Sequence, residues 1–357
     1  MINVSLIGSG KIAASHAAGV EANPEAVRVT AVVEPQRDAG EAMAKRLGAK
    51  HFASLEALLA DAAAADAVDA VVVCTPPSVR VNLIERSLDR GWAVLAEKPL
   101  AHRLIDSERL GRLAASHPGQ PCAAGLCHRF TPAVNRMAEL TRAGEIGRLV
   151  RIENVFAATI PGMDRHWMSD PEVSGGGSLL DAGTHSVDLM QYLAGPCALA
   201  GAITTHAWPG RGDSNASILL KAAGGGETGA GEPVACQIAT GWAEPTRFHL
   251  RLVGERGSLA YDFEEPEELA VVTGDGGQRI EPVETHEVRF ERQLLAFARS
   301  VEAGRVVPPL SSFAEALRVM RLMAKIDDAV VDDARVLADA SSLKVGHAGK
   351  ARHSEAV

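Results

Sequence analysis

The chain begins with the stretch MINVSLIGSGKIAASHAAGV, residues 1–20, which indicates the class of fold. An apolar run over residues 2–7 predicts a buried strand, and the Ala-rich segment after residue 10 predicts a helix. Between them, the pattern G-x-G-x-x-A is formed by Gly8, Ser9, Gly10, Lys11, Ile12 and Ala13. In such a loop the glycines permit a tight turn and a close approach of the backbone to a pyrophosphate. The stretch therefore predicts a dinucleotide-binding loop, with a purely structural glycine turn as the alternative.

A carboxylate at the end of the next strand supports this interpretation. Residues 29–33 predict a second strand that ends in Glu34, 24 residues after Gly10. This is near the usual position of a carboxylate that accepts hydrogen bonds from the adenosine ribose. Such a carboxylate repels a 2′-phosphate, which favours NAD over NADP, but Arg37 lies close by and could accommodate that phosphate. A solvated side chain at a strand end is the alternative for Glu34.

Residues 1–125 continue to alternate apolar runs with amphipathic stretches, as in a parallel sheet covered by helices. Strands are predicted over residues 70–74 and 93–96, and helices over 55–59, 81–88 and 104–113. Such sheets bind ligands beyond the carboxyl ends of their strands. We therefore expect the cofactor to contact the residues that end these two strands, namely Cys74, Thr75, Pro76, Glu97 and Lys98. A lysine at this edge can also hydrogen-bond a reacting oxygen, whereas an exposed loop lysine is the alternative.

The pattern changes after residue 125, and a second domain of α+β type is predicted over residues 126–345. Strands joined by turns are expected over 149–157, 198–207, 217–221, 234–241 and 248–253, which favours an antiparallel sheet. Residues 222–233, rich in Gly and Glu, are expected to form a long hairpin loop. Two late helices over 290–303 and 313–331 could pack back on the first domain. Residues 346–357 are expected to be a flexible tail.

A helical pair of polar residues is the strongest catalytic signal of this second domain. If a helix begins at about residue 179, Asp181 and His185 stand one turn apart on one face. A histidine placed in this way beside a carboxylate can act as a general base. A helix-capping aspartate and a buried structural histidine are the alternative. No metal is expected, because two ligands without a nearby cysteine or further histidine do not build a catalytic zinc site.

Composition argues against several other classes of protein. The net charge is −9 with scattered Lys and Arg residues, and only 4% of the residues are aromatic, so nucleic acid is not an expected partner. No apolar stretch is long enough for a membrane helix, and no room for a secretion signal precedes Gly8. Five cysteines without a C-x-x-C pair indicate reduced thiols. A cytoplasmic protein is therefore expected.

Taken together, the motifs resemble the family named for glucose-fructose oxidoreductase, inositol dehydrogenase and a rhizopine-catabolism protein (Gfo/Idh/MocA). The resemblance spans nearly the whole chain and rests on Gly8, Gly10, Ala13, Thr75, Pro76, Glu97-Lys98-Pro99, Arg129-Phe130, Pro132, residues 175–177, Asp181, Gly183 and His185. It implies an α/β Rossmann domain followed by an α+β domain with a large, mainly antiparallel sheet, whose outer face supports homodimers or homotetramers. It also implies NAD, with NADP possible, and a sugar, cyclitol or related polyol as the substrate.

By this resemblance, Lys98 corresponds to the lysine that holds the reacting oxygen, Asp181 to the supporting carboxylate and His185 to the proton-transfer histidine. Lys98, Asp181 and His185 would thus also bind substrate. Further candidates for substrate binding, on segments expected to border the cleft, are Arg129, Asn154, Arg165, His166 and Trp167. Arg129 could instead pair with an acid at the domain junction, and Trp167 could belong to the core. Two other functions remain open: an NAD-dependent glycosidase that uses transient oxidation, and a non-catalytic sugar- or dinucleotide-binding regulator.

Overall fold

The computed structural model of the protein describes residues 1–224 and 231–330. The predicted tail over residues 346–357 lies outside the described residues, as do residues 225–230 of the predicted hairpin loop. The two strands on either side of that loop, β9 (Asn215–Ala222) and β10 (Val234–Gly241), pair with each other antiparallel.

Six strands from the first part of the chain and the late strand β15 (Ser311–Ser312) form a seven-stranded sheet in the order β15-β6-β5-β4-β1-β2-β3. Its parallel strands are β1 (Ile2–Ile7), β2 (Val27–Val33), β3 (Lys50–Phe52), β4 (Ala70–Val73), β5 (Ala93–Glu97) and β6 (Cys122–Gly125). The helices between them are α1 (Lys11–Glu21), α2 (Arg37–Leu47), α3 (Leu55–Ala60), α4 (Ala62–Asp66), α5 (Arg80–Asp89) and α6 (Leu104–Ser116). This order reverses between β1 and β4, which places a ligand-binding crevice at their carboxyl ends.

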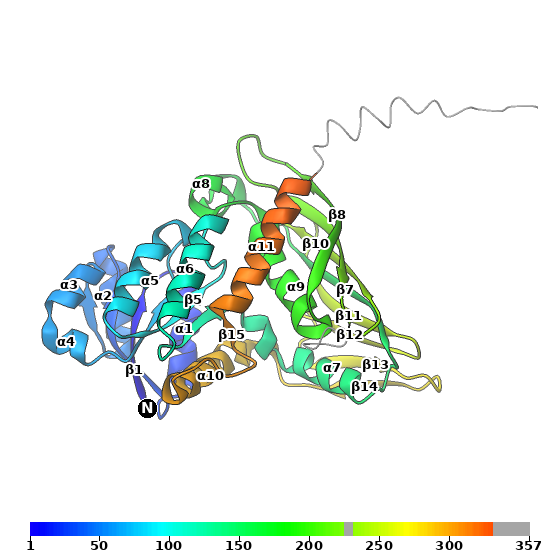
Figure 1. The fold of residues 1–357 in the computed structure, drawn as a ribbon, viewed down its shortest axis with the longest axis horizontal. Coiled ribbons are helices and arrows are strands. Elements are labelled where there is room, and N and C mark those ends of the chain that lie inside the picture. The colour runs from blue at the N-terminus through cyan, green and yellow to red at the C-terminus, as the bar shows by residue number, and fades with distance from the viewer. Residues whose placement is uncertain (225–230, 331–357) are drawn as a thin grey trace, which may run out of the picture.

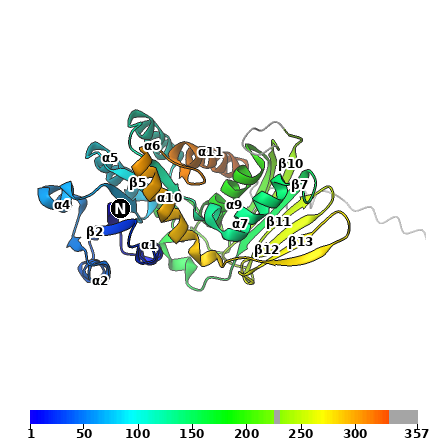
Figure 2. The ribbon, with the colours of Figure 1, turned by 90° about the horizontal axis from the view of Figure 1, so that it is seen from below.

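The second sheet has eight strands in the order β14-β13-β12-β11-β7-β10-β9-β8. The strands not yet given are β7 (Leu149–Ala157), β8 (Cys197–Thr205), β11 (Arg247–Gly254), β12 (Ser258–Asp262), β13 (Glu268–Val272) and β14 (Gln278–Pro282). All neighbouring pairs are antiparallel except β7 with β10. The helices α7 (Pro132–Arg142) and α9 (Ser178–Ala194) lie against one face of this sheet (Figure 2). The short helix α8 (Pro171–Ser174) precedes α9.

The two final helices return to the first domain. Helix α10 (Arg289–Ala303) packs on α1, and the short strand β15 (Ser311–Ser312) pairs antiparallel with β6. Helix α11 (Phe313–Ala329) runs between the two sheets (Figure 1). Its Phe313 and Met320 belong to the core of the first domain, whereas Val319 and Met323 belong to the core of the second. One helix therefore ties the two cores together.

The expected fold class is confirmed, but several element boundaries differ from those predicted. The predicted strand over residues 29–33 begins two residues earlier, and the helix expected from residue 179 begins at Ser178. The short strand β3 and the strands β12, β13 and β14 were not predicted. Strand β3 has only three residues with one of them buried, and every residue of β14 is at least partly exposed, so neither carries a strong apolar pattern.

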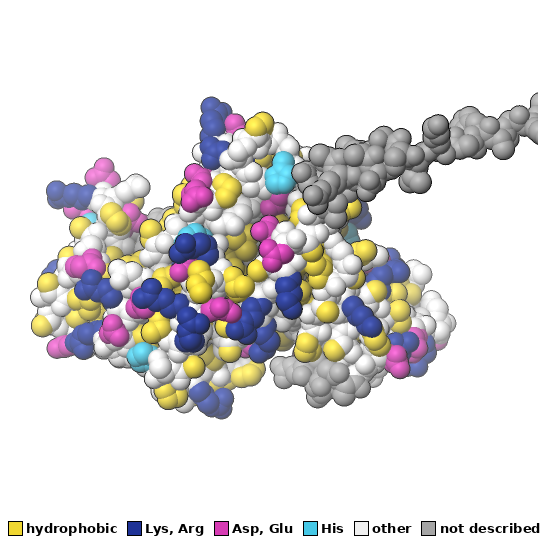
Figure 3. Space-filling model, turned by 45° about the horizontal axis from the view of Figure 1, so that its top comes forward, with side chains coloured by type: hydrophobic (Ala, Val, Ile, Leu, Met, Phe, Trp, Pro, Cys, Tyr) yellow, Lys and Arg dark blue, Asp and Glu magenta, His cyan; other side chains and the backbone are white. Residues whose placement is uncertain are grey.

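Surface charge, helix character and cysteine state give three further observations. Basic and acidic side chains are interspersed over the face drawn in Figure 3. Of the helices in the described ranges, none has both the length and the apolar character needed to span a membrane. All five cysteines are free thiols, and four of them are buried.

Candidate active site

The glycine loop lies between β1 and α1, and its geometry suits a dinucleotide. Gly8 has a φ of +100°, and a Cβ at this residue would lie 3.1 Å from the carbonyl oxygen of Cys74. Only glycine adopts this φ angle without strain. The short distance to Cys74 shows in addition that the ends of β1 and β4 approach each other closely. A Cβ at Gly10 would meet nothing within 4 Å, so the N-terminus of α1 faces open space on this side. Helix N-termini favour anionic groups.

Two hydroxyl groups on the same edge support this assignment. Ser9 Oγ and Thr75 Oγ1 are buried, and neither has a hydrogen-bond partner among the described residues. Buried hydroxyl groups without a partner are unusual, and an absent ligand is one explanation for them. Lys11 and Ile12 begin α1, and Pro76 follows Thr75 at the end of β4. The loop residues present therefore fit the phosphates of a nicotinamide dinucleotide.

Glu34 lies directly beside this loop. Its Oε2 accepts a hydrogen bond from the backbone N–H of Ser9 at 2.9 Å, and its Oε1 accepts one from Gln36 at 3.0 Å. Arg37, in contrast, is exposed and donates to Glu41 at 2.7 Å, one turn further along α2. The carboxylate is thus placed at the loop, whereas the guanidinium group is directed to another partner.

A lysine–aspartate contact joins the two domains at the carboxyl end of β5. Lys98 Nζ donates to the backbone oxygen of Asp181 at 3.0 Å and also to its carboxylate Oδ1. Both side chains are mostly shielded from solvent, with 16% and 25% of their surfaces exposed. Because Lys98 follows β5 and Asp181 stands in the first turn of α9, this ion pair fixes one side of the domain junction.

The backbone around Lys98 is held by a buried network that was not predicted. Arg80, at the start of α5, is 2% exposed and donates to the backbone oxygens of Glu97 and Pro99. It also donates to the backbone oxygen of Thr75 at 2.5 Å. One guanidinium group therefore links the ends of β4 and β5. Desolvation lowers the pKa of Arg80 to about 10.

Glu97 was expected to contact the cofactor, but its side chain is buried against the protein. Its Oε1 lies 2.8 Å from Nε2 of His16 on α1, and its Oε2 accepts from the backbone N–H of Lys98 at 3.2 Å. Both His16 and Glu97 are almost fully buried. Glu97 therefore positions Lys98 relative to α1.

His185 lies one turn after Asp181 on α9, but its neighbours differ from those expected. No hydrogen bond or ion pair joins it to Asp181 in the part of the chain that the structure describes, and its buried Nδ1 has no partner there. Instead, its ring meets the ring of His128 edge to face, with centroids 4.5 Å apart. His128 also packs on Phe156 and Phe263 at 4.9 and 5.5 Å.

The electrostatic surroundings keep both imidazoles neutral. Burial, together with the charges of Lys98 and Arg289, holds the pKa values of His128 and His185 well below their usual range. A neutral His185 has a free lone pair at neutral pH, as a general base requires.

The premise behind the expected absence of a metal was wrong. Cys127, His128 and His185 each offer a ligand atom, and these atoms lie within 4.8 Å of one another. Cys127 and His128 were predicted to lie in the same domain as His185, but they stand far from it along the chain, so their proximity was not visible in the spacing. Burial raises the pKa of the Cys127 thiol to about 11, and Lys98 and Arg289 add positive charge nearby, which disfavours a cation at this point.

The start of α9 is fixed by Asp213, which sequence reasoning missed. Its Oδ2 accepts hydrogen bonds from the backbone N–H of Leu179 at 2.7 Å and from Ser178 Oγ at 2.8 Å. Gly177 allows this approach, since a Cβ there would lie 2.1 Å from the Asp213 backbone oxygen. A carboxylate in the first turn satisfies free N–H groups and complements the helix dipole. Asp213 thereby sets the position of the helix that carries Asp181 and His185.

The other predicted substrate residues are distributed differently. Arg129 is 5% exposed and donates to both carboxylate oxygens of Asp188, at 2.9 and 2.6 Å, and to Glu315 at 2.8 Å. This is the alternative considered above, in which it pairs with acids at the domain junction. Asn154 is 1% exposed, and its amide group donates to the backbone oxygen of His249 at 2.9 Å.

Arg165, His166 and Trp167 lie on the exposed segment before α8. The side chain of Arg165 is 85% exposed, and its nearest acid is Asp164 at 3.6 Å. His166 Nδ1 accepts from the backbone N–H of Met168 at 3.3 Å, and Trp167 is 42% exposed. No contact in the described ranges joins these three side chains to Lys98 or His185, so their role in binding stays a prediction.

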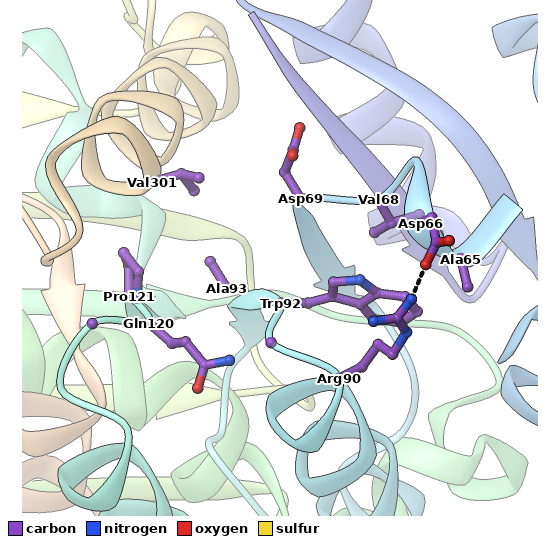
Figure 4. Close-up of a pocket in the computed structure, with 12 residues that line it drawn as sticks. Ala65, Asp66, Val68, Asp69, Arg90, Trp92, Ala93, Gln120, Pro121 and Val301 are labelled. Carbon is purple, nitrogen blue, oxygen red and sulfur yellow. Dashed lines mark hydrogen bonds and ion pairs between the residues drawn. The ribbon is translucent and has the colours of Figure 1, made fainter. Parts of the chain in front are cut away.

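A hollow of about 350 Å³ lies at the opposite edge of the first sheet (Figure 4). It is lined by Asp69 and Trp92, which immediately precede β4 and β5, so it lies at the amino ends of the strands. Its polar groups are already paired: Arg90 with Asp66, and Asp69 with the backbone N–H of Asn3 at 2.7 Å. Lys98 and the glycine loop lie at the other edge, beyond the carboxyl ends of the strands.

These features define a two-domain, dinucleotide-dependent class of enzyme, with a Rossmann domain and a large antiparallel sheet. Comparison with known families agrees. Residues 2–125 match the NAD-binding Rossmann domain of the GFO/IDH/MocA oxidoreductase family, and residues 134–260 match the C-terminal domain of the same family. The chain belongs to this family. The predicted resemblance and the assignment as an oxidoreductase that uses a nicotinamide dinucleotide are therefore confirmed.

Characterised relatives cover most of the chain. An inositol 2-dehydrogenase from Rhizobium meliloti is 29% identical over 85% of this chain and 87% of its own length. A 4-carboxy-2-hydroxymuconate-6-semialdehyde dehydrogenase from Sphingobium is 25% identical over 91% and 98%. Among solved structures, a levoglucosan dehydrogenase with NADH and levoglucosan has a TM-score of 0.82 at 18% identity, covering 92% of this chain and 96% of that one. At this identity the likeness shows the fold.

Proposed function

We propose that this protein transfers a hydride between a nicotinamide dinucleotide and a hydroxyl or keto carbon of a sugar, cyclitol or related polyol. The observation that carries the proposal is the meeting of Lys98, Asp181 and His185 at the junction of the two domains. Lys98 contacts Asp181 directly, and its charge acts on His185. Lys98 follows β5 at the sheet edge that also carries the open glycine loop.

In the oxidation direction, each of the three residues has a distinct task. His185, held neutral by burial, accepts the proton of the substrate hydroxyl group. Lys98 donates a hydrogen bond to the same oxygen and stabilises its developing negative charge. Asp181 keeps the Lys98 ammonium group in place through their ion pair. When bound, the nicotinamide ring supplies the acceptor for the hydride.

The role proposed for Asp181 differs from the one that the resemblance implied. Since its carboxylate contacts Lys98 rather than His185, it would support the base indirectly, by placing the neighbouring cation. The ring of His128 is the group that contacts His185.

A screen of turnover tests the proposal. Absorbance at 340 nm is followed with NAD and with NADP against a panel of sugars, cyclitols and glycosides. Reduction of the cofactor by a simple polyol supports a dehydrogenase. Release of a sugar from a glycoside without net reduction would instead support the NAD-dependent glycosidase, and cofactor binding without any turnover would support a regulator.

The base is tested by His185→Ala. We expect turnover to fall by about 10²- to 10⁴-fold while the affinity for NADH, measured by fluorescence, stays unchanged. His117→Ala, at the end of α6 and far along the chain from the site, is the matched control. Full activity of the His185 variant would refute this role.

Cofactor choice, assembly and location are proposed on separate observations. NAD is favoured over NADP because Glu34 lies at the loop and Arg37 is directed to Glu41.

A homodimer or homotetramer through the second sheet is supported by exposed apolar side chains on its strands, including Ile203 and Leu219. Five free cysteines favour a cytoplasmic location.

A further inference from the structure

Arg289, the first residue of α10, is a cation placed close to His128 and His185. Its Nη1 donates to the backbone oxygen of His286 at 2.8 Å, and its guanidinium group lies 5.0 Å from the ring centroid of Phe290. It also contacts the thiol of Cys127. That sulfur atom lies within 4.8 Å of ring nitrogens of both His128 and His185. The guanidinium group is therefore separated from the proposed base by a single side chain.

No carboxylate lies within ion-pair distance of Arg289 in residues 1–224 and 231–330, and its Nε is buried without a partner. Arg129, which directly follows His128 in the chain, shows the contrast, because it is paired with Asp188 and Glu315. Arg289 is half-buried, and a buried N–H group that lacks an acceptor is costly, so an anion that accepts from this guanidinium group would be stabilised.

The charges around the site do not balance without a further anion. Lys98 is neutralised by Asp181, and burial keeps the two histidines uncharged. Glu97 is turned toward His16 and the backbone N–H of Lys98. Arg289 is thus the cation of this cluster that no described acid compensates.

We propose that Arg289 binds a carboxylate of the substrate, so that the substrate class is a hydroxy acid such as a sugar acid rather than a neutral polyol. This inference rests on the proposed function. A guanidinium group matches a carboxylate with two parallel N–H···O bonds, which adds orientation to attraction. The carboxylate takes no part in the redox step: the carbinol carbon loses a hydride to the nicotinamide, and its hydroxyl proton goes to His185.

The same cation would act in a second way. Its charge contributes to the lowered pKa of His185 in the free protein. A bound carboxylate would offset that charge, so the base would become stronger when an anionic substrate is present. Binding of the substrate carboxylate would therefore raise the pKa of His185, the proposed base.

The test compares matched substrates that differ in one carboxylate: D-glucuronate with D-glucose, and D-gluconate with D-glucitol. We expect the wild-type chain to have the higher kcat/KM for the acid of at least one pair. Arg289→Gln should reduce kcat/KM for that acid by about 10- to 100-fold more than it changes kcat/KM for the neutral partner. Arg292→Gln is the matched control, since Arg292 stands on the same helix and pairs with exposed Glu284.

Binding measured without turnover separates the possible failures. Each acid is titrated by calorimetry into the NADH complex of the wild-type and Arg289→Gln chains, and NADH itself into both free chains. Acid binding that depends on Arg289, with equal NADH affinity, supports the inference.

A neutral substrate turned over without any preference for acids would overturn it while the proposed function stands. A loss of NADH affinity in the variant would also overturn it, because Arg289 would then bind the cofactor's pyrophosphate. If the wild-type chain turns over no substrate, the proposed function fails, and the calorimetric result still decides whether Arg289 binds a carboxylate.

Discussion

Arg80 offers a quantitative test of how the backbone around Lys98 is held. Its guanidinium group satisfies the backbone oxygens of Thr75, Glu97 and Pro99. Replacing Arg80 with methionine keeps the length of the side chain but leaves these three buried acceptors unpaired. At about 2 kcal/mol for each unsatisfied group, the loss is about 6 kcal/mol. Against this, the charge no longer has to be buried: the lowering of its pKa from 12.5 to about 10 corresponds to about 3 kcal/mol.

The difference predicts that Arg80→Met lowers the free energy of unfolding by about 3 kcal/mol. Urea unfolding followed by circular dichroism measures this value. Arg86→Met is the matched control, because Arg86 stands on the same helix but forms an exposed ion pair with Glu56. That pair should contribute at most about 1 kcal/mol. Equal stability of the two variants would refute the network. We also expect a fall in kcat for Arg80→Met, since the backbone before Lys98 loses its support.

Two further predictions concern the helix and the histidines of the site. Asp213→Ala should lower the free energy of unfolding by about 1 kcal/mol through the lost cap of α9, and an unchanged urea midpoint would contradict this. His128 and His185 resist protonation in the folded chain but accept protons near pH 6.5 when unfolded, so stability should decrease as the pH falls below about 6.5. His128→Phe removes one of these protons, and the slope of unfolding free energy against pH should become shallower by up to about 1.4 kcal/mol per pH unit. Identical slopes for the variant and the wild-type chain would show that His128 is not the source.

The sequence predicted those parts of the fold that local pattern determines. The glycine loop, the strands β1, β2, β4 and β5 and the helix that carries Asp181 all follow from apolar spacing and glycine chemistry, whereas the short buried strand β6 was not predicted. Strands β3 and β14 were missed because they are short or exposed, so their pairing depends on neighbours rather than on their own residues.

The site was predictable only in part, because its contacts join distant segments. Lys98 and Asp181 were both expected at the site, but their direct ion pair follows from packing between domains. Arg80, Asp213 and Arg289 carry no motif, since an isolated Arg or Asp has the same local pattern whether it is exposed or buried. Helical spacing correctly placed Asp181 and His185 on one face, yet spacing alone could not show that Lys98 would be the partner of the carboxylate.

The position of α11 explains why these distant contacts can be held together. A site formed by two domains is normally sensitive to their relative motion, because interfaces between domains are often weak. Here α11 places Phe313 and Met320 in one core and Val319 and Met323 in the other. Rotation of one domain against the other would have to pull part of this helix out of a core, which exposes buried apolar surface. The ion pair of Lys98 with Asp181 therefore rests on a junction that is already fixed. Catalysis can then depend on the placement of groups rather than on closure of the domains.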